Sequence, residues 1–107
     1  MRSKVYKGTG AAGVPAYSRE GDSIYPGNAI GGTPAFTISW DSIYEGNFSA
    51  RPVCNVNLMS VYRGNSISGV PLGVIQGNYI YPGNSMSSQP LGYSPEGDIY
   101  LLAVMAL

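Results

Sequence analysis

Residues 24–44 read IYPGNAIGGTPAFTISWDSIY and contain one full copy of a unit that recurs along the chain. An aliphatic residue followed by tyrosine returns at steps of 18 or 19 residues, with the tyrosines at Tyr6, Tyr25, Tyr44, Tyr62, Tyr81 and Tyr100. A glycine stands two positions after each of the first five tyrosines, and a proline follows it six or seven residues later. A period close to 20 residues is typical of repetitive β and solenoid architectures.

The spacing inside the unit separates a rigid part from a variable part. Each of these prolines is followed by the next tyrosine after ten residues, whereas the glycine-to-proline distance shortens by one residue between Gly46 and Pro52. Paired strands do not tolerate a one-residue slip, because it moves every side chain to the other face, but loops do. We therefore expect a loop from glycine to proline and a β-hairpin from proline to tyrosine.

Residue types support the hairpins. Aromatic and β-branched residues lie at both ends of segment 34–44. Turn-forming residues stand in the middle of the sister segments: Glu20-Gly21-Asp22, Gln76-Gly77-Asn78 and Pro95-Glu96-Gly97-Asp98. Asn57-Leu58-Met59 departs from this turn chemistry. The apolar positions after each proline and before each tyrosine predict a core of Val5, Ala16, Ile24, Ala35, Ile43, Val53, Val61, Leu72, Ile80, Leu91 and Ile99. A third apolar series is expected to tuck each loop against the next unit: Ala11, Ile30, Ile67 and Met86.

The repeats also predict how the units are arranged. A lone hairpin is marginally stable in water, so the units must share one core. An open β-solenoid and a closed ring both satisfy this requirement. We favour an all-β, closed, pseudo-five-fold ring of five 19-residue β-hairpin repeats, propeller-like or prism-like and with no helix of note, since closure removes exposed strand edges.

The tail favours closure as well. Residues 101–107 are apolar throughout, whereas an open solenoid needs polar caps. We expect residues 99–107 to form a closing strand that pairs with or packs on the N-terminal strand around Val5 and Tyr6. The alternative is a self-association surface that makes a homo-oligomer through this C-terminal strand. Residues 1–107 then form a single repeat domain with units at about 6–24, 25–43, 44–61, 62–80 and 81–99.

The repeated (Ile/Val)-Tyr-x-Gly-Asn … Gly-x-Pro unit resembles that of the small bacterial proteins described as five-fold beta-flowers, over nearly the whole chain. The resemblance implies a ring of five similar β units around a pseudo-five-fold axis. It implies no activity, because no function is established for that family. The third and fifth units depart from Gly-x-Pro with Ala50-Arg51-Pro52 and Ser88-Gln89-Pro90, which affects loop shape rather than architecture.

Composition narrows the classes of function. The 107 residues carry six basic and six acidic side chains, so the net charge is zero and we expect neither a nucleic-acid groove nor a charged arm. Fifteen glycines and eight prolines exclude a helical bundle. The apolar tail is too short to span a membrane. No apolar run of signal-peptide length follows the basic residues between Met1 and Lys4, so the sequence does not assign a compartment.

The chain is poor in catalytic groups. It has no histidine and a single cysteine, Cys54, so we expect no internal disulfide, no metal site, no cofactor and no enzymatic activity. Cys54 is interpreted as a small semi-buried residue rather than a nucleophile. Hairpin turns account for four of the six acids, and a glycosidase-like pair of Glu20 or Asp22 with Asp41 is not favoured. The acids are Glu20, Asp22, Asp41, Glu45, Glu96 and Asp98.

Residues that depart from the repeat are the candidates for binding. The recurring tyrosines and asparagines are interpreted as packing and turn residues, because a residue present in every unit usually builds the unit. Units two and three hold the only tryptophan, Trp40, together with Phe48 and Arg51, and tryptophan and arginine are enriched at binding hot spots. We expect these three residues to bind ligand in a non-enzymatic β module whose partner is a glycan, a peptide or a protein. The alternative is a purely structural or oligomer-forming module of a larger bacterial assembly.

Overall fold

The segments that run from Pro15, Pro34, Pro52 and Pro71 to the following tyrosine fold as β-hairpins, as predicted. The computed structural model describes residues 2–47, 51–84 and 86–107. Within these residues there are ten strands and one helix: β1 Arg2–Lys7, β2 Tyr17–Glu20, β3 Ser23–Pro26, β4 Phe36–Ser39, β5 Ser42–Glu45, β6 Pro52–Asn57, β7 Ser60–Arg63, β8 Gly73–Gln76, β9 Tyr79–Pro82, β10 Gly92–Tyr93 and α1 Ile99–Val104.

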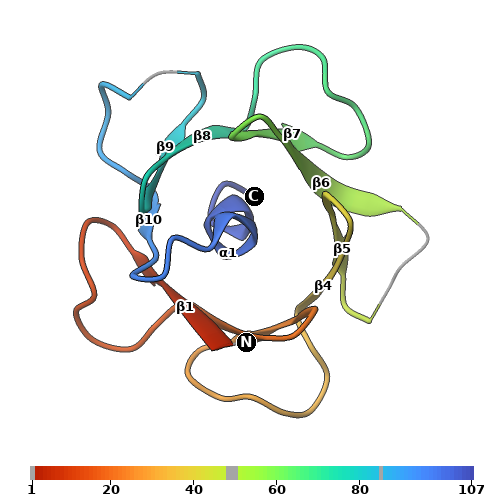
Figure 1. Ribbon diagram of the computed structural model, residues 1–107, viewed down its shortest axis with the longest axis vertical. Coiled ribbons are helices and arrows are strands. Elements are labelled where there is room, and N and C mark those ends of the chain that lie inside the picture. Colours follow the sequence, from red (N-terminus) through yellow and green to blue (C-terminus); the bar gives the residue numbers. More distant parts are fainter. Residues whose placement is uncertain (1, 48–50, 85) are drawn as a thin grey trace.

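The strands close into one antiparallel barrel in the order β1-β10-β9-β8-β7-β6-β5-β4-β3-β2. The molecule is a flat ring with extents of 35 × 34 × 18 Å (Figure 1). Closure joins β10 to β1 with Gly92 opposite Lys7, which repeats the register of Tyr17 opposite Pro26 in hairpin β2–β3. β1 therefore acts as the return strand for β10, and the prediction of a closed ring is confirmed.

The apolar tail is a helix rather than a strand. After β10 the chain turns inward, and α1 lies in the middle of the ring (Figure 1). The carboxylate of Asp98 caps the helix by accepting hydrogen bonds from the backbone N–H groups of Tyr100 and Leu101. The predicted closing strand over residues 99–107 is therefore wrong, and so is the expectation of no helix of note.

The width of the ring explains this outcome. Eight strands already enclose an interior that side chains just fill, and a ten-stranded barrel is wider. A helix whose residues are buried all round fills the remaining space, and the buried residues of α1 are Leu101, Leu102, Ala103 and Val104. The same burial means that these four residues offer no surface for the homo-oligomer that the sequence suggested.

The residue before each of the five repeat tyrosines that lie in strands is fully enclosed, as predicted. The five side chains with 0 % exposure at this position are Val5, Ile24, Ile43, Val61 and Ile80. Ile99 is half-buried because it lies in α1, and the residues after the prolines are only half-buried: Ala16, Ala35, Val53, Leu72 and Leu91. The prediction omitted four buried inward-facing residues of the strands, Ile38, Cys54, Val56 and Ile75.

Outward-facing side chains tie the strands to the loops. The side chains of Ser18, Thr37 and Asn55 donate hydrogen bonds to the carbonyls of the glycines that begin the following loops, Gly27, Gly46 and Gly64. Beyond these anchors the loops stand away from the ring, as Figure 1 shows. The third apolar series is exposed there rather than tucked against a neighbour: Ala11, Ile30, Ile67 and Met86.

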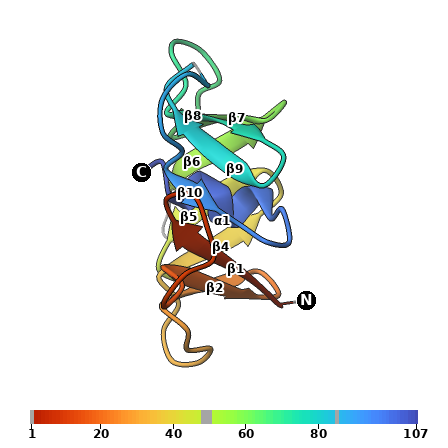
Figure 2. The same ribbon diagram turned by 90° about the vertical axis from the view of Figure 1, so that its left-hand side faces the viewer.

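The ring has two different faces. The tip face carries the hairpin turns at residues 21–22, 40–41, 58–59 and 77–78, together with the start of α1. The loop face carries the opposite ends of the strands and Leu107. β1 begins on the tip face, since Arg2 lies opposite Glu20, and the C-terminal end of the chain lies on the other side of the disc (Figure 2). The start of α1 is at the tip face, where the Tyr100 hydroxyl donates a hydrogen bond to Asp41. The helix therefore runs through the ring from the tip face toward the loop face.

Candidate functional site

The hairpin turns of the tip face differ in a way that their shared backbone does not require. Hairpins β2–β3 and β8–β9 place glycines at the positive-φ position of the turn, Gly21 at 61° and Gly77 at 62°. At the same position β4–β5 has Trp40 at 57°, and β6–β7 has Leu58 at 51° followed by Met59 at 67°. A bulky residue in this left-handed conformation costs about 1–2 kcal/mol.

These three residues also form an exposed apolar surface, which we call the tip patch. Trp40 and Leu58 each expose 92 % of their surface and Met59 exposes 49 %. Their two hairpins are neighbours in the ring, because β5 pairs with β6. Backbone strain and exposed apolar area are both unfavourable in the isolated protein, and such outliers concentrate at functional sites.

The tip patch is held on a rigid base. The backbone N–H of Val56 donates to the carbonyl of Asp41 at 2.9 Å, and that of Ile75 donates to the carbonyl of Met59 at 2.7 Å. The hydroxyl of Tyr100 donates to the Asp41 carboxylate at 3.2 Å. Partial burial of Tyr100, together with the charge of Asp41, raises the pKa of its phenol. Asp41, beside Trp40, therefore puts a negative charge next to the tip patch.

The structure separates the residues that the sequence grouped as a site. Trp40 precedes β5 on the tip face, whereas Arg51 lies beyond the other end of β5, on the loop face. Arg51 is exposed and lines a hollow of about 430 Å³ together with Tyr44 and Asn65. Phe48 lies outside the described residues. Leu58 and Met59 were missed, although their departure from turn chemistry was visible in the sequence.

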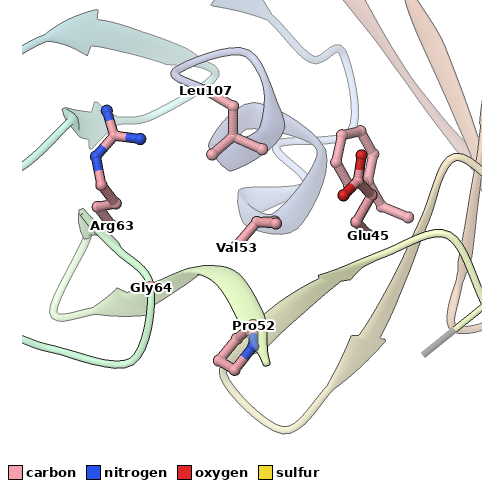
Figure 3. A pocket seen from close by; sticks show the side chains of 7 residues that line it. Glu45, Pro52, Val53, Arg63, Gly64 and Leu107 are labelled. Atoms are coloured by element: carbon pink, nitrogen blue, oxygen red, sulfur yellow. The ribbon is translucent and has the colours of Figure 1, made fainter. Parts of the chain in front are cut away.

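A second hollow lies on the loop face, directly below the hairpins that carry the tip patch. Its volume is about 480 Å³ and its lining is Phe36, Glu45, Pro52, Val53, Arg63, Gly64 and Leu107. Figure 3 shows Leu107 between the side chains of Arg63 and Glu45. Met105, two residues earlier, packs against β10 instead: a Cβ built on Gly92 would lie 2.9 Å from Cγ of Met105. We call this hollow the Leu107 pocket.

One acid is part of the core rather than of a solvated turn. Asp98 exposes 4 % of its surface and pairs with Arg19, whose Nη1 lies 3.0 Å from its Oδ2. Arg19 faces inward where sister hairpins carry Ile38 and Ile75, and its guanidinium lies 5.4 Å from the ring centroid of Tyr100. The expectation that Asp98 belongs to a hairpin turn is therefore wrong. The residue caps α1 and ties it to the wall.

The remaining reactive groups are placed as follows. Cys54 is completely buried, not semi-buried, and burial raises the pKa of its thiol to about 12, so the nucleophilic thiolate is disfavoured. Glu20 forms an ion pair with Arg2. Among the described residues, no three His, Cys, Asp or Glu side chains gather in a way that would hold a metal ion.

Comparison with known proteins adds one match. A family model described as "6-fold beta flower protein" matches residues 5–101. The beta-flower resemblance of the sequence is thereby supported, whereas the family's description counts six units where we expected five. Neither curated proteins nor solved structures give a match. No helix in the described part of the chain is long and apolar enough to cross a membrane.

Proposed function

The chain belongs to the beta-flower family, and from that premise we propose that it is a non-enzymatic binding module that contacts a protein partner through the tip patch. The observation that carries the proposal is the pair of neighbouring turns in which Trp40 and Leu58 stand at positive φ where sister turns have glycine, with Met59 following Leu58 at positive φ as well. A convex patch of tryptophan, leucine and methionine suits an apolar cleft on a protein or peptide.

We also infer that the ring is built from five hairpin units, although six copies of the aliphatic-tyrosine pair are present. Two features support this count. β1, with Val5 and Tyr6, pairs with β10 in the register of a hairpin, and the last pair, Ile99 and Tyr100, lies in α1. The sixth copy then belongs to the helix inside the ring rather than to its wall.

The non-enzymatic part of the proposal is supported by the state of the reactive groups. The Cys54 thiol is buried with a raised pKa, Asp98 is committed to Arg19 and to the cap of α1, and Glu20 is paired with Arg2. The remaining acids are spread around the ring rather than aimed into one cleft.

Peptide selection tests the binding function. Random peptides are selected on the sparsely immobilised wild-type protein and counter-selected on the Trp40→Gly/Leu58→Gly double variant, which restores the glycine of the sister turns. We expect apolar peptides with basic residues to be enriched and to shift the emission of Trp40, the only tryptophan. Their affinity should fall at least about tenfold on the double variant, as for hot-spot residues.

A matched control keeps the test specific. Gln76 is an exposed residue beside a sister turn, and Gln76→Ala should leave peptide affinity unchanged. Selection that enriches nothing beyond the counter-selected pool would contradict the proposal. Peptides that bind the double variant as tightly as the wild type would contradict it too.

A further inference from the structure

The charges of the chain are divided between the two faces. The ion pairs Arg2–Glu20 and Arg19–Asp98 neutralise two acids near the tip face. The acids that remain there are Asp22, Asp41 and Glu96, set against the cation of Lys4, whose backbone N–H donates to the Glu96 carboxylate. The ends of the strands and loops on the loop face carry Lys7, Arg51 and Arg63 against Glu45. The chain is neutral overall, so the tip face is negative and the loop face is positive.

The tip face and the loop face also differ in shape. The tip face projects Trp40 and Leu58 into solvent, and the loop face holds the Leu107 pocket, an open hollow of about 480 Å³, which is within the size range of small-molecule sites. Both features belong to the same two hairpins, since the pocket is lined by the opposite ends of β4, β5, β6 and β7. A second ring placed on the first, with little rotation about the ring axis, brings the patch of one over the pocket of the other.

We propose that the partner of the tip patch is the loop face of a second copy of this chain. Trp40 of one copy enters the Leu107 pocket of the next, and Asp41 faces Arg63 across the contact. The inference rests on the proposed function and names its partner. The contact joins two different surfaces, so it is heterologous; with little rotation between copies it does not close, and it extends into an open stack of rings.

The size of the faces is sufficient for such a contact. A disc of 35 × 34 Å has a face of roughly 900 Å², which is about the area that one partner contributes to an interface of standard size. Opposite charges on the two faces favour the head-to-tail orientation, because tip-to-tip and loop-to-loop contacts bring like charges together. Screening by salt weakens that preference.

Two variants that each disable one face test the inference. The tip variant is Trp40→Gly/Leu58→Gly, which adopts the turns of the sister hairpins. The loop variant is Arg63→Glu/Leu107→Asp, which changes exposed residues and places negative charge in the pocket. Circular dichroism and melting temperature establish that both are folded. Lys7→Glu makes the same charge change as Arg63→Glu, on the loop face but away from the pocket, and serves as the control.

Sedimentation velocity from micromolar to millimolar concentration gives the result. We expect the wild type to form a ladder of oligomers at low salt that shortens at high salt, and each variant alone to be monomeric. An equimolar mixture of the two variants should form a dimer and stop there, because one intact tip face meets one intact loop face. The association constant should fall at least about tenfold for each variant and less for Lys7→Glu.

Each other outcome overturns the stack. A wild type that stays monomeric throughout refutes it, as does a mixture of variants that stays monomeric. Self-association of the loop variant alone shows a tip-to-tip contact, and self-association of the tip variant shows a loop-to-loop contact. If the wild type is monomeric but selected peptides still need Trp40, the stack fails and the binding function stands. If peptides ignore the double substitution, the binding function fails as well.

Discussion

Truncating Leu102 to alanine tests whether α1 is the centre of the hydrophobic core. Leu102 exposes 0 % of its surface inside the ring, and Leu→Ala at such sites costs about 2–5 kcal/mol, because the transfer free energy is lost and a cavity remains. A domain of this size has a free energy of unfolding of about 5–15 kcal/mol. Each kcal/mol lowers its melting temperature by about 4–8 °C. We therefore expect the melting temperature to fall by at least about 8 °C.

The chain offers a matched control for this experiment. Leu58 is exposed to 92 % on the tip face, so Leu58→Ala removes the same atoms without leaving a cavity and should change stability by less than about 0.5 kcal/mol. Urea unfolding followed by far-UV circular dichroism measures both variants. A loss below about 1 kcal/mol for Leu102→Ala, or equal losses for the two variants, would refute the placement of α1 in the core.

Three further measurements follow from described contacts. Asp98→Ala removes a helix cap and leaves the Arg19 charge buried, so the free energy of unfolding should fall by about 3–5 kcal/mol. The double variant Arg19→Ile/Asp98→Asn copies the isoleucine of sister hairpins and retains a cap, so it should recover part of the lost free energy in urea unfolding. If it recovers none, the pairing of Arg19 with Asp98 is contradicted. The folded-state pKa of Cys54 is raised from 9.0 to about 12, so its contribution to stability is complete below pH 9 and is lost as the pH rises through this window, by about 1.4 kcal/mol per unit. Tyr100 contributes in the same direction, and unfolding curves at pH 8 and pH 10.5 should show a smaller loss for Cys54→Ala than for the wild type. Gly73→Ala should lower the melting temperature more than Gly92→Ala, because its Cβ would lie 3.0 Å from the backbone carbonyl oxygen of Tyr81, whereas that of Gly92 first meets the movable side chain of Met105; the reverse order would show that the tail packs rigidly on β10.

The period of the sequence predicted the wall of the ring because it is a backbone property. Hairpin length, turn position and the enclosed residues before each tyrosine all repeat, and a one-residue change would move side chains to the wrong face. The closed ring followed from the need to cover strand edges. These features depend on local geometry and alternation, which a single sequence displays directly.

The tail was misjudged because the repeat was extended one copy too far. Ile99 and Tyr100 match the pattern of a strand, yet Asp98 is a helix N-cap residue and residues 101–107 are leucine, alanine and methionine with a single valine. These local signals for a helix were present in the sequence. The space to be filled inside a ten-stranded ring, which decided the outcome, was not.

The candidate site was predicted in part. Trp40 is exposed on a turn, as its departure from the repeat suggested. Arg51 lies at the other end of β5, because the two residues are eleven positions apart with a complete strand between them. Leu58 and Met59 join Trp40 only through the pairing of β5 with β6. Which tips become neighbours is a property of the ring rather than of any one repeat.

The contacts of α1 bear on how a repetitive wall holds a single, non-repetitive helix. A ring of identical hairpins would offer the helix one equivalent position per hairpin, and the protein molecules would be a mixture of these rotational positions. Arg19 pairs with Asp98 on one side of the helix, and Gly92 leaves room for Met105 on another. These two contacts fix one rotational position of the helix inside the ring. A version rebuilt from identical repeats would keep the strands of its wall but lose the contacts that fix the rotational position of the helix. It would therefore melt over a broader range of temperature.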